Sequence, residues 1–336
     1  KRQYDLSKDL WLQSAKLDEE FPTVWRNLAL IYMNKENDGA NAVKCMERAF
    51  RLDSTDARIL MELDQLYKRL HRSHEERLMF LSQYPDLIVQ RDDLILEKIT
   101  LLNQTGEFLK AKQLLDNHIF HPWEGGEGKV PAQYQYSRVE LAKVALQNKC
   151  YDDAIKLLEE CLEYPPHLGE GKLINAQEND FYYFMGCAYE ANGNSFKAGN
   201  CWEKAINGPI EPAAAMYYND AKPDKIFYAG LALLKLGRVD EAHGRFYKLI
   251  TYGEHHLFDH VRMDYFAVSL PDLLIWDDSL DRQNIIHCKY MMALGLYGLG
   301  NINKAVKLIN EVAEMDNNHQ GIGAFLTFFL TFAGKF

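Results

Sequence analysis

The sequence predicts an all-α protein, a right-handed α-solenoid (superhelix) of about seven helix hairpins that ends in a capping helix. Trp25, Leu60 and Ile95 stand 35 residues apart. The segments 15–18 and 50–53, AlaLysLeuAsp and PheArgLeuAsp, keep the same step. Small and bulky residues alternate at helical spacing around these positions. A fixed period of this size is typical of one supersecondary unit stacked on copies of itself.

Each repeat reads as two amphipathic helices. Bulky and small residues three or four positions apart lie on one face, so two helices can approach closely and fill each other's gaps. We expect one solenoid domain over residues 1–336, opened by a half repeat. The expected repeats are 21–54, 57–86, 92–119, 134–166, 179–208, 223–252 and 286–317, with a capping helix at 319–333.

This pattern resembles the tetratricopeptide repeat (TPR), whose signature spans roughly 34 residues. The copy that matches best holds Met185, Gly186, Tyr189, Gly193, Ala198, Trp202 and Ala205. Others hold Gly230, Gly237 and Phe246, or Ala293, Gly300 and Ile309. The resemblance covers about four fifths of the chain and implies a fold that binds protein segments.

Three stretches interrupt the repeats, at 118–133, 164–180 and 251–284. Glycine and proline indicate loops in the first two, and the third begins as helix. Insertions in a solenoid usually gather on one face, often the binding face. We therefore expect these segments to mark whatever the scaffold binds.

Whole strings within these insertions carry a narrower resemblance. HisProTrpGluGlyGlyGluGlyLys (121–129), LeuGlyGluGlyLys (168–172) and the segment 264–274 are similar to bacterial proteins in which such repeats follow a mutarotase-like β-sandwich. The resemblance implies a cytoplasmic bacterial protein that handles sugars. The strand-rich pattern of a β-sandwich occurs nowhere in this sequence, so the resemblance places any catalysis wholly or partly in that other domain.

The first candidate surface is the inner groove, which first helices line in TPR arrays. The positions that correspond in this sequence are aromatic with scattered acids: Tyr136, Val139, Asp180, Tyr183, Asp224, Phe227, Leu231, Tyr290 and Tyr297. Arrays that hold acidic chaperone tails carry lysine and asparagine at some of these places, and this chain does not. An apolar lining predicts either an interface with a protein segment or a groove filled by the insertions or a neighbouring domain.

The second candidate is the loop 118–133. Its polar and aromatic side chains are His118, His121, Trp123, Glu124, Glu127 and Lys129. Tryptophan beside carboxylates suits a sugar, by ring stacking and directional acceptors. The alternative is a structural loop that packs between repeats with its tryptophan buried.

The third candidate is the loop 167–180, with Glu170 and Lys172. Since one repeat separates it from the loop 118–133, the two can lie on the same face. Glu170 with Glu124 or Glu127 would then be a carboxylate pair suited to acid–base chemistry.

Bulk properties narrow the partners. The net charge is −10 and no lysine and arginine stripe is evident, so we expect neither nucleic acid nor an anionic membrane. The longest apolar run, 322–333, is too short to span a bilayer. The six cysteines form no CxxC pair and indicate core thiols in a reducing compartment. His256 and His260 are spaced for a metal without an evident third ligand, so no metal or other cofactor is expected.

Together these observations predict a non-catalytic scaffold that binds a protein segment or the chain's own N-terminal domain. The alternative function is a carbohydrate site shared with a β-sandwich, to which His121–Lys129, Glu170 and Lys172 would contribute.

Overall fold

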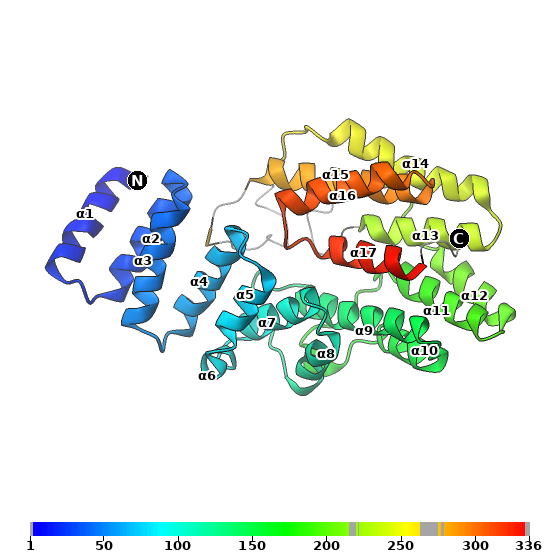
Figure 1. The fold of residues 1–336 in the computed structure, drawn as a ribbon, viewed down its shortest axis with the longest axis horizontal. Helices are drawn as coiled ribbons and strands as arrows, with labels where there is room; N and C mark the ends of the chain where they lie inside the picture. Colours follow the sequence, from blue (N-terminus) through cyan, green and yellow to red (C-terminus); the bar gives the residue numbers. More distant parts are fainter. Residues whose placement is uncertain (1–2, 215–219, 221, 263–274, 277–278, 333–336) are drawn as a thin grey trace. The chain divides into compact units, whose positions relative to one another are not determined.

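The computed structural model describes residues 3–214, 220, 222–262, 275–276 and 279–332. The predicted fold class is confirmed: these residues form α-helices joined by turns and loops, with one short 3-10 helix and no strand among them (Figure 1). The first helices are α1 (Tyr4–Leu17), α2 (Pro22–Glu36), α3 (Gly39–Leu52), α4 (Ala57–Arg69), α5 (His74–Leu81), α6 (Pro85–Ile88), α7 (Asp92–Gln104) and α8 (Phe108–Asn117). The others are α9 (Lys129–Gln147), α10 (Tyr151–Glu160), η1 (Pro166–Leu168), α11 (Asn179–Ala191), α12 (Ser195–Ala205), α13 (Pro223–Lys235), α14 (Val239–His256), α15 (Leu280–Gly298), α16 (Ile302–Met315) and α17 (Gln320–Phe332).

The chain forms two compact units. The first comprises residues 1–101 with 273–278, and the second comprises 102–272 with 279–336. Within each unit, consecutive helices pack as hairpins, such as α2 with α3 in the first and α11 with α12 in the second. Each unit is thus an α-solenoid in its own right. The segment 264–274, which carries part of the narrower resemblance, lies outside the described residues.

One left-handed residue per hairpin marks the turn from the first helix to the second. Its φ lies between 52° and 80° in every hairpin. These residues are Asn37, His71, Gly106, Lys149, Gly193, Gly237 and Gly300. Glycine takes this conformation without strain, which explains four of the seven. Their spacing along the chain lengthens after Gly106, as the repeat positions in the sequence do.

Small residues on the first helix of a hairpin receive large residues from the second. A Cβ added at Gly186 would lie 2.2 Å from Trp202 Nε1, and one at Gly230 would lie 2.4 Å from Phe246 Cε1. Both large residues follow their glycine at the same spacing in the chain. The small and bulky pattern of the sequence is therefore the packing code of the hairpins.

Gly295 makes the least forgiving of these contacts, and its replacement by alanine should destabilise the second unit. The new Cβ would lie 2.6 Å from the backbone oxygen of Phe246, which cannot rotate away. We expect Gly295→Ala to lower the free energy of unfolding by about 1–3 kcal/mol. The control is Gly199→Ala on α12, where nothing lies within 4 Å and alanine should stabilise the helix by about 1 kcal/mol. Urea denaturation of both variants checks the prediction, which is wrong if the two shift alike.

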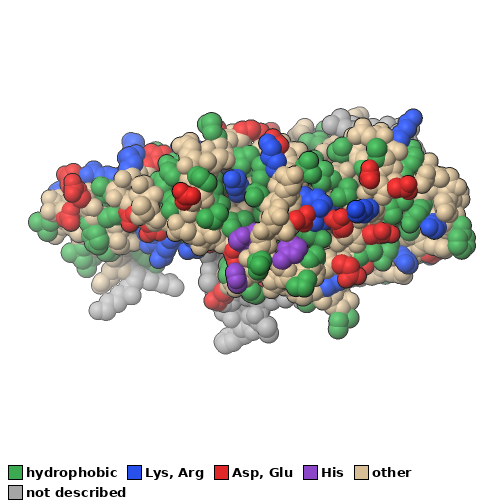
Figure 2. All heavy atoms as spheres, turned by 90° about the horizontal axis from the view of Figure 1, so that it is seen from below, with side chains coloured by type: hydrophobic (Ala, Val, Ile, Leu, Met, Phe, Trp, Pro, Cys, Tyr) green, Lys and Arg blue, Asp and Glu red, His purple; other side chains and the backbone are tan. Residues whose placement is uncertain are grey.

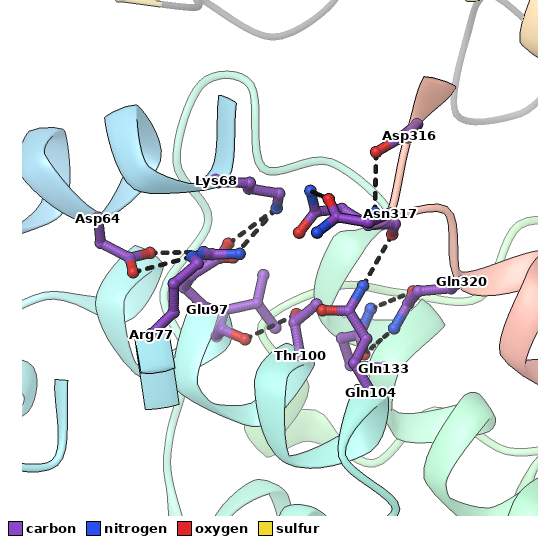
Figure 3. Close-up of polar contacts among 12 residues, drawn as sticks. Asp64, Lys68, Arg77, Glu97, Thr100, Gln104, Gln133, Asp316, Asn317 and Gln320 are labelled. Atoms are coloured by element: carbon purple, nitrogen blue, oxygen red, sulfur yellow. Dashed lines mark hydrogen bonds and ion pairs between the residues drawn. The ribbon is translucent and has the colours of Figure 1, made fainter. Parts of the chain in front are cut away.

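A buried ionic network stabilises the first unit. The Arg77 guanidinium, fully buried on α5, donates to Asp64 Oδ2 at 2.7 Å and to Glu97 Oε1 at 2.6 Å (Figure 3). Lys68 Nζ also donates to Glu97 Oε1, at 3.1 Å. Asp64 is therefore a buried carboxylate that is paired with a buried guanidinium.

Residues from the third insertion lie against first helices of this unit. The indole Nε1 of Trp276 donates to the backbone oxygen of Glu62 on α4 at 3.0 Å, and the ring is 4% exposed. The side-chain amide of Asn34 on α2 donates to the Ile275 oxygen at 2.9 Å. A segment more than 200 residues away in sequence therefore covers part of α2 and α4.

Candidate functional site

The predicted groove residues of the second unit lie on α9, α11, α13 and α15, and most are buried. Buried residues are Val139, Asp180, Tyr183, Phe227, Leu231, Tyr290 and Tyr297, whereas Tyr136 and Asp224 are half-buried. The structure therefore brings these positions onto first helices, as the sequence predicts, but does not leave them open to solvent.

The element that covers the aromatic residues is α17. The Phe328 ring has centroids of four rings within 5.9–6.1 Å: Phe184, Phe227, Tyr228 and Tyr297. Phe325 lies 5.2 Å from Tyr297, also centroid to centroid. Both phenylalanines of α17 are buried. The helix expected to cap the last repeat thus packs on the first helices α11, α13 and α15, and it also contacts α9.

Polar contacts join α17 to α9. The amides of Gln133 and Gln320 donate to each other, at 2.8 and 2.9 Å. The Thr327 hydroxyl donates to Glu140 Oε2 at 2.8 Å, and Lys143 Nζ donates to Glu140 Oε1 at 2.5 Å. Figure 3 shows the amide pair.

We name the residues that contact α17 the α17-binding surface. It consists of Gln133, Tyr136, Glu140, Lys143, Phe184, Phe227, Tyr228, Tyr290 and Tyr297. An aromatic floor with a few buried polar groups at one edge is the composition of a surface that binds one helix in one position.

Asp180, on α11, forms a buried ion pair with Lys225. Its carboxylate accepts a hydrogen bond from Lys225 Nζ at 2.5 Å, and Asp224 lies nearby. Burial raises the pKa of Asp180, and the charge of Lys225 opposes that rise. The pair joins α11 to α13, so Asp180 holds two first helices together and does not face a ligand in this state.

His319 lies just before α17 and packs on Tyr290, with ring centroids 4.6 Å apart. Burial lowers the pKa of His319 below its ordinary 6.5; Asp316 opposes the shift and His287 on α15 adds to it. The His287 Nε2–H donates to the Ala213 oxygen at 2.8 Å, and burial lowers the pKa of His287 as well. Burial near the start of α17 therefore favours the neutral form of the His319 and His287 imidazoles.

Acid should weaken the attachment of α17 for this reason. A lowered folded-state pKa means that the stabilisation is complete above about pH 6.5 and declines as the pH falls below that value. We expect the melting temperature of the wild-type chain to fall between pH 7.5 and pH 5.5. In His319→Gln the melting temperature should fall less over the same range. His255→Gln, at an exposed position, is the control and should retain it. An unchanged acid response in His319→Gln would refute the assignment.

The two insertion loops pair with each other, as the sequence suggested they could. The Phe120 amide donates to the His167 oxygen at 2.8 Å, and the Gly128 amide donates to Glu170 Oε2 at 2.7 Å. Burial raises the pKa of Glu170, the Gly128 amide opposes it, and the charge of Glu127 adds to it. Glu127 and Glu170 are thus electrostatic neighbours.

Of the other candidate residues in the two loops, some contact neighbouring loop residues and others are exposed. The Trp123 ring packs on Gly126, where a Cβ would lie 2.3 Å from the indole. Lys172 Nζ donates to the Leu162 oxygen at 2.6 Å and forms an ion pair with Glu178. His121 and Glu124 are exposed, and Lys129 starts α9. Trp123 is half-buried and contacts its own loop, so it matches neither an open ligand site nor the fully buried tryptophan of the structural alternative.

Sequence reasoning did not identify α17 as the partner of the aromatic residues. Two signals were available: α17 is largely apolar, which is typical of a helix that packs inside a protein, and Glu140 with Lys143 places charges on a helix face that otherwise packs. Neither signal specifies which surface the helix covers.

The described part of the chain shows no metal-binding cluster. It contains no group of three or more His, Cys, Asp or Glu side chains placed to hold a metal. His256 lies 2.6 Å from Asp259 and His260 lies 2.9 Å from Asp281, so each imidazole has a carboxylate neighbour. Among the helices that the structure describes, none has the length and apolar character to cross a membrane. On the face drawn in Figure 2, basic side chains are scattered among acidic ones.

No family model matches the chain. Among solved structures, it is similar to a tetratricopeptide repeat protein from Parabacteroides merdae ATCC 43184, with a TM-score of 0.45 and 11% identity over 92% of this chain and 98% of that one. It is also similar to yeast Tom70 (TM-score 0.40, 13% identity, 96% and 57% covered). A third is YrrB, a TPR protein with an unusual peptide-binding site (0.39, 16%, 58% and 90%). At these values the likenesses add nothing beyond the arrangement of helix hairpins already described.

Proposed function

We propose that this chain is a non-catalytic scaffold whose α17-binding surface takes a helix from a protein. The observation that carries the proposal is the position of α17, which packs on α11, α13 and α15 through Phe325 and Phe328 and on α9 through Gln320 and Thr327. Helix-in-groove recognition uses apolar anchors at this kind of spacing on one helix face. In the free chain, the bound helix is the chain's own.

The physical basis is the amount of aromatic surface at stake. Without α17, the rings of Phe184, Phe227 and Tyr228 would lose their cover on one side, and aromatic surfaces of this kind bind partners strongly. A partner helix, whether from another protein or from a further domain of the same polypeptide, would bury the same rings. Intramolecular and intermolecular binding are thus two uses of one surface.

All six cysteines are free thiols, and Cys45, Cys161, Cys187 and Cys288 are buried. Thiols kept unpaired in this number suit a reducing compartment, so we place the protein in the cytoplasm.

A synthetic peptide of residues 317–332 tests the proposal. We expect it to bind full-length chain that carries Phe328→Asp, whose own α17 is detached, and to bind wild-type chain at least about ten-fold more weakly, because α17 competes there. Fluorescence anisotropy measures both. A peptide with serine in place of Phe325 and Phe328 is the matched control. If the unmodified peptide binds no better than this control, the α17-binding surface does not take helices.

A further inference from the structure

Three contacts between α9 and α17 share one separation along the chain. Gln133 meets Gln320, Tyr136 meets Gly323, and Glu140 meets Thr327, each pair being 187 residues apart. A constant separation means that the two helices run parallel and in one register. A Cβ at Gly323 would lie 3.1 Å from the Tyr136 hydroxyl, so this position admits only a small residue.

The spacing of these contacts is that of a coiled-coil seam. On each helix the contacting residues are three and then four positions apart, which is the a and d pattern of a heptad. In this seam the two outer positions are polar: a Gln–Gln pair and a Glu–Thr pair. Polar residues at such positions set register and orientation at some cost in stability.

A shift by one turn would leave buried polar groups without their partners. Glu140 and Lys143 are 2% and 3% exposed, so both charges depend on neighbours inside the protein. Lys143 Nζ also donates to the Ala324 oxygen of α17 at 3.4 Å. In a register shifted by three residues, Glu140 would face Leu330 or Ala324 and lose the Thr327 hydroxyl, which costs the desolvation of a charged acceptor.

A second neighbour restricts the bound helix at its start. A Cβ at Gly321 would lie 2.5 Å from the Tyr290 ring. The two glycines of α17 therefore fit the surface while each lowers its intrinsic helix stability by about 1 kcal/mol. A helix of this length and composition is marginal by itself, so α17 folds as it binds and is open to replacement by a helix that is already formed.

We propose that the partner of the α17-binding surface is a helix of another protein, one that runs parallel to α9 and carries the polar pattern of α17. That pattern is an amide at the place of Gln320, small residues at 321 and 323, and a hydroxyl at 327, with aromatic residues at 325 and 328. Glu140, Lys143 and Gln133 recognise this pattern through hydrogen bonds. This inference rests on the proposed function and adds the class of partner and its register.

Peptide variants bound to the full-length Phe328→Asp chain test the reading. Replacing Thr327 by valine in the peptide of residues 317–332 should weaken binding by about ten-fold, because a hydrogen bond to a buried carboxylate is lost. Replacing Gln320 by leucine should weaken it comparably. Leu326→Ser is the control, since Leu326 is 42% exposed on the outer side of α17, and should change binding less than about two-fold.

A double-mutant cycle assigns the effect to Glu140. In a chain that also carries Glu140→Gln, Thr327→Val should cost clearly less than in the chain with Glu140, because the charged acceptor is gone. If Thr327→Val weakens peptide binding equally in both chains, Glu140 is not the group that recognises the Thr327 hydroxyl.

The outcomes separate the two proposals. If the unmodified peptide does not bind, the proposed function fails together with this inference. If it binds and the valine and leucine peptides bind equally well, the surface takes helices without the polar pattern, and only this inference is overturned. A wild-type dimer in light scattering that dissociates on Phe328→Asp would show a second copy's α17 as the occupant, and would overturn the assignment to another protein.

Discussion

Replacing Phe328 by aspartate should detach α17 from the second unit while leaving the helix hairpins folded. Phe328 is 1% exposed and lies among four aromatic rings, so a carboxylate there would be buried without a partner. Because burying an unpaired charge costs more than the docking of one helix contributes, the helix leaves. Truncation to alanine at such a site costs about 3–5 kcal/mol, and aspartate should exceed that.

The measurement is dye binding together with circular dichroism. Detachment exposes the aromatic rings of α11, α13 and α15, so we expect strong binding of a hydrophobic fluorescent dye with only a small loss of helicity. Leu326→Asp is the matched control, because it adds the same charge to the same helix at a position that is 42% exposed. If the Phe328 and Leu326 variants bind the dye equally, α17 does not cover the rings.

Replacing Arg77 by methionine should be the most damaging single change in the first unit. The substitution keeps much of the side-chain volume but leaves Asp64, 1% exposed, and Glu97 with one cationic neighbour in Lys68. Breaking a buried ion pair by removing one partner costs about 3–5 kcal/mol. Urea denaturation measures it, with Arg51→Ala as the control: Arg51 is 68% exposed and 3.8 Å from Glu47, a pair that contributes about 0–1 kcal/mol.

The pH dependence of this variant has a definite sign. In the wild-type chain, burial by itself raises the pKa of Glu97. The charges of Lys68 and Arg77 outweigh burial and lower this pKa to about 2. Its stabilisation is therefore present above its ordinary 4.5 and declines as the pH falls toward 2. Without Arg77, protonation of the carboxylates removes unpaired charge, so the gap between variant and wild type should narrow in acid. A gap in the free energy of unfolding that stays constant from pH 7 down to about pH 3 would contradict the ionic account.

The hairpins could be predicted from the sequence because their determinants are local. Gly186 and Trp202 belong to one hairpin, and so do Gly230 and Phe246, so the pattern of small and bulky residues shows which helix packs on which. The left-handed turn residues Gly193 and Gly237 follow the same logic, since glycine marks the turn. What repeats in the sequence is what each hairpin needs by itself.

The contents of the candidate site could be predicted only in part. The sequence places Tyr183, Phe227 and Tyr297 on first helices, where the structure has them. The identity of their cover depends on a contact between α9 and α17, almost two hundred residues apart, and no local pattern at Gln133 or Glu140 specifies such a partner. The Arg77 network is likewise tertiary, because its four charged residues come from three helices.

Hydrogen–deuterium exchange on the wild-type chain and on Phe328→Asp tests most directly the central claim, that α17 occupies the α17-binding surface. The expected result is slow exchange in peptides that cover residues 320–332 of the wild type, lost in the variant together with protection in the stretch 133–143 of α9. Fast exchange of residues 320–332 in the wild type, or a variant in which α9 keeps its protection, would contradict it.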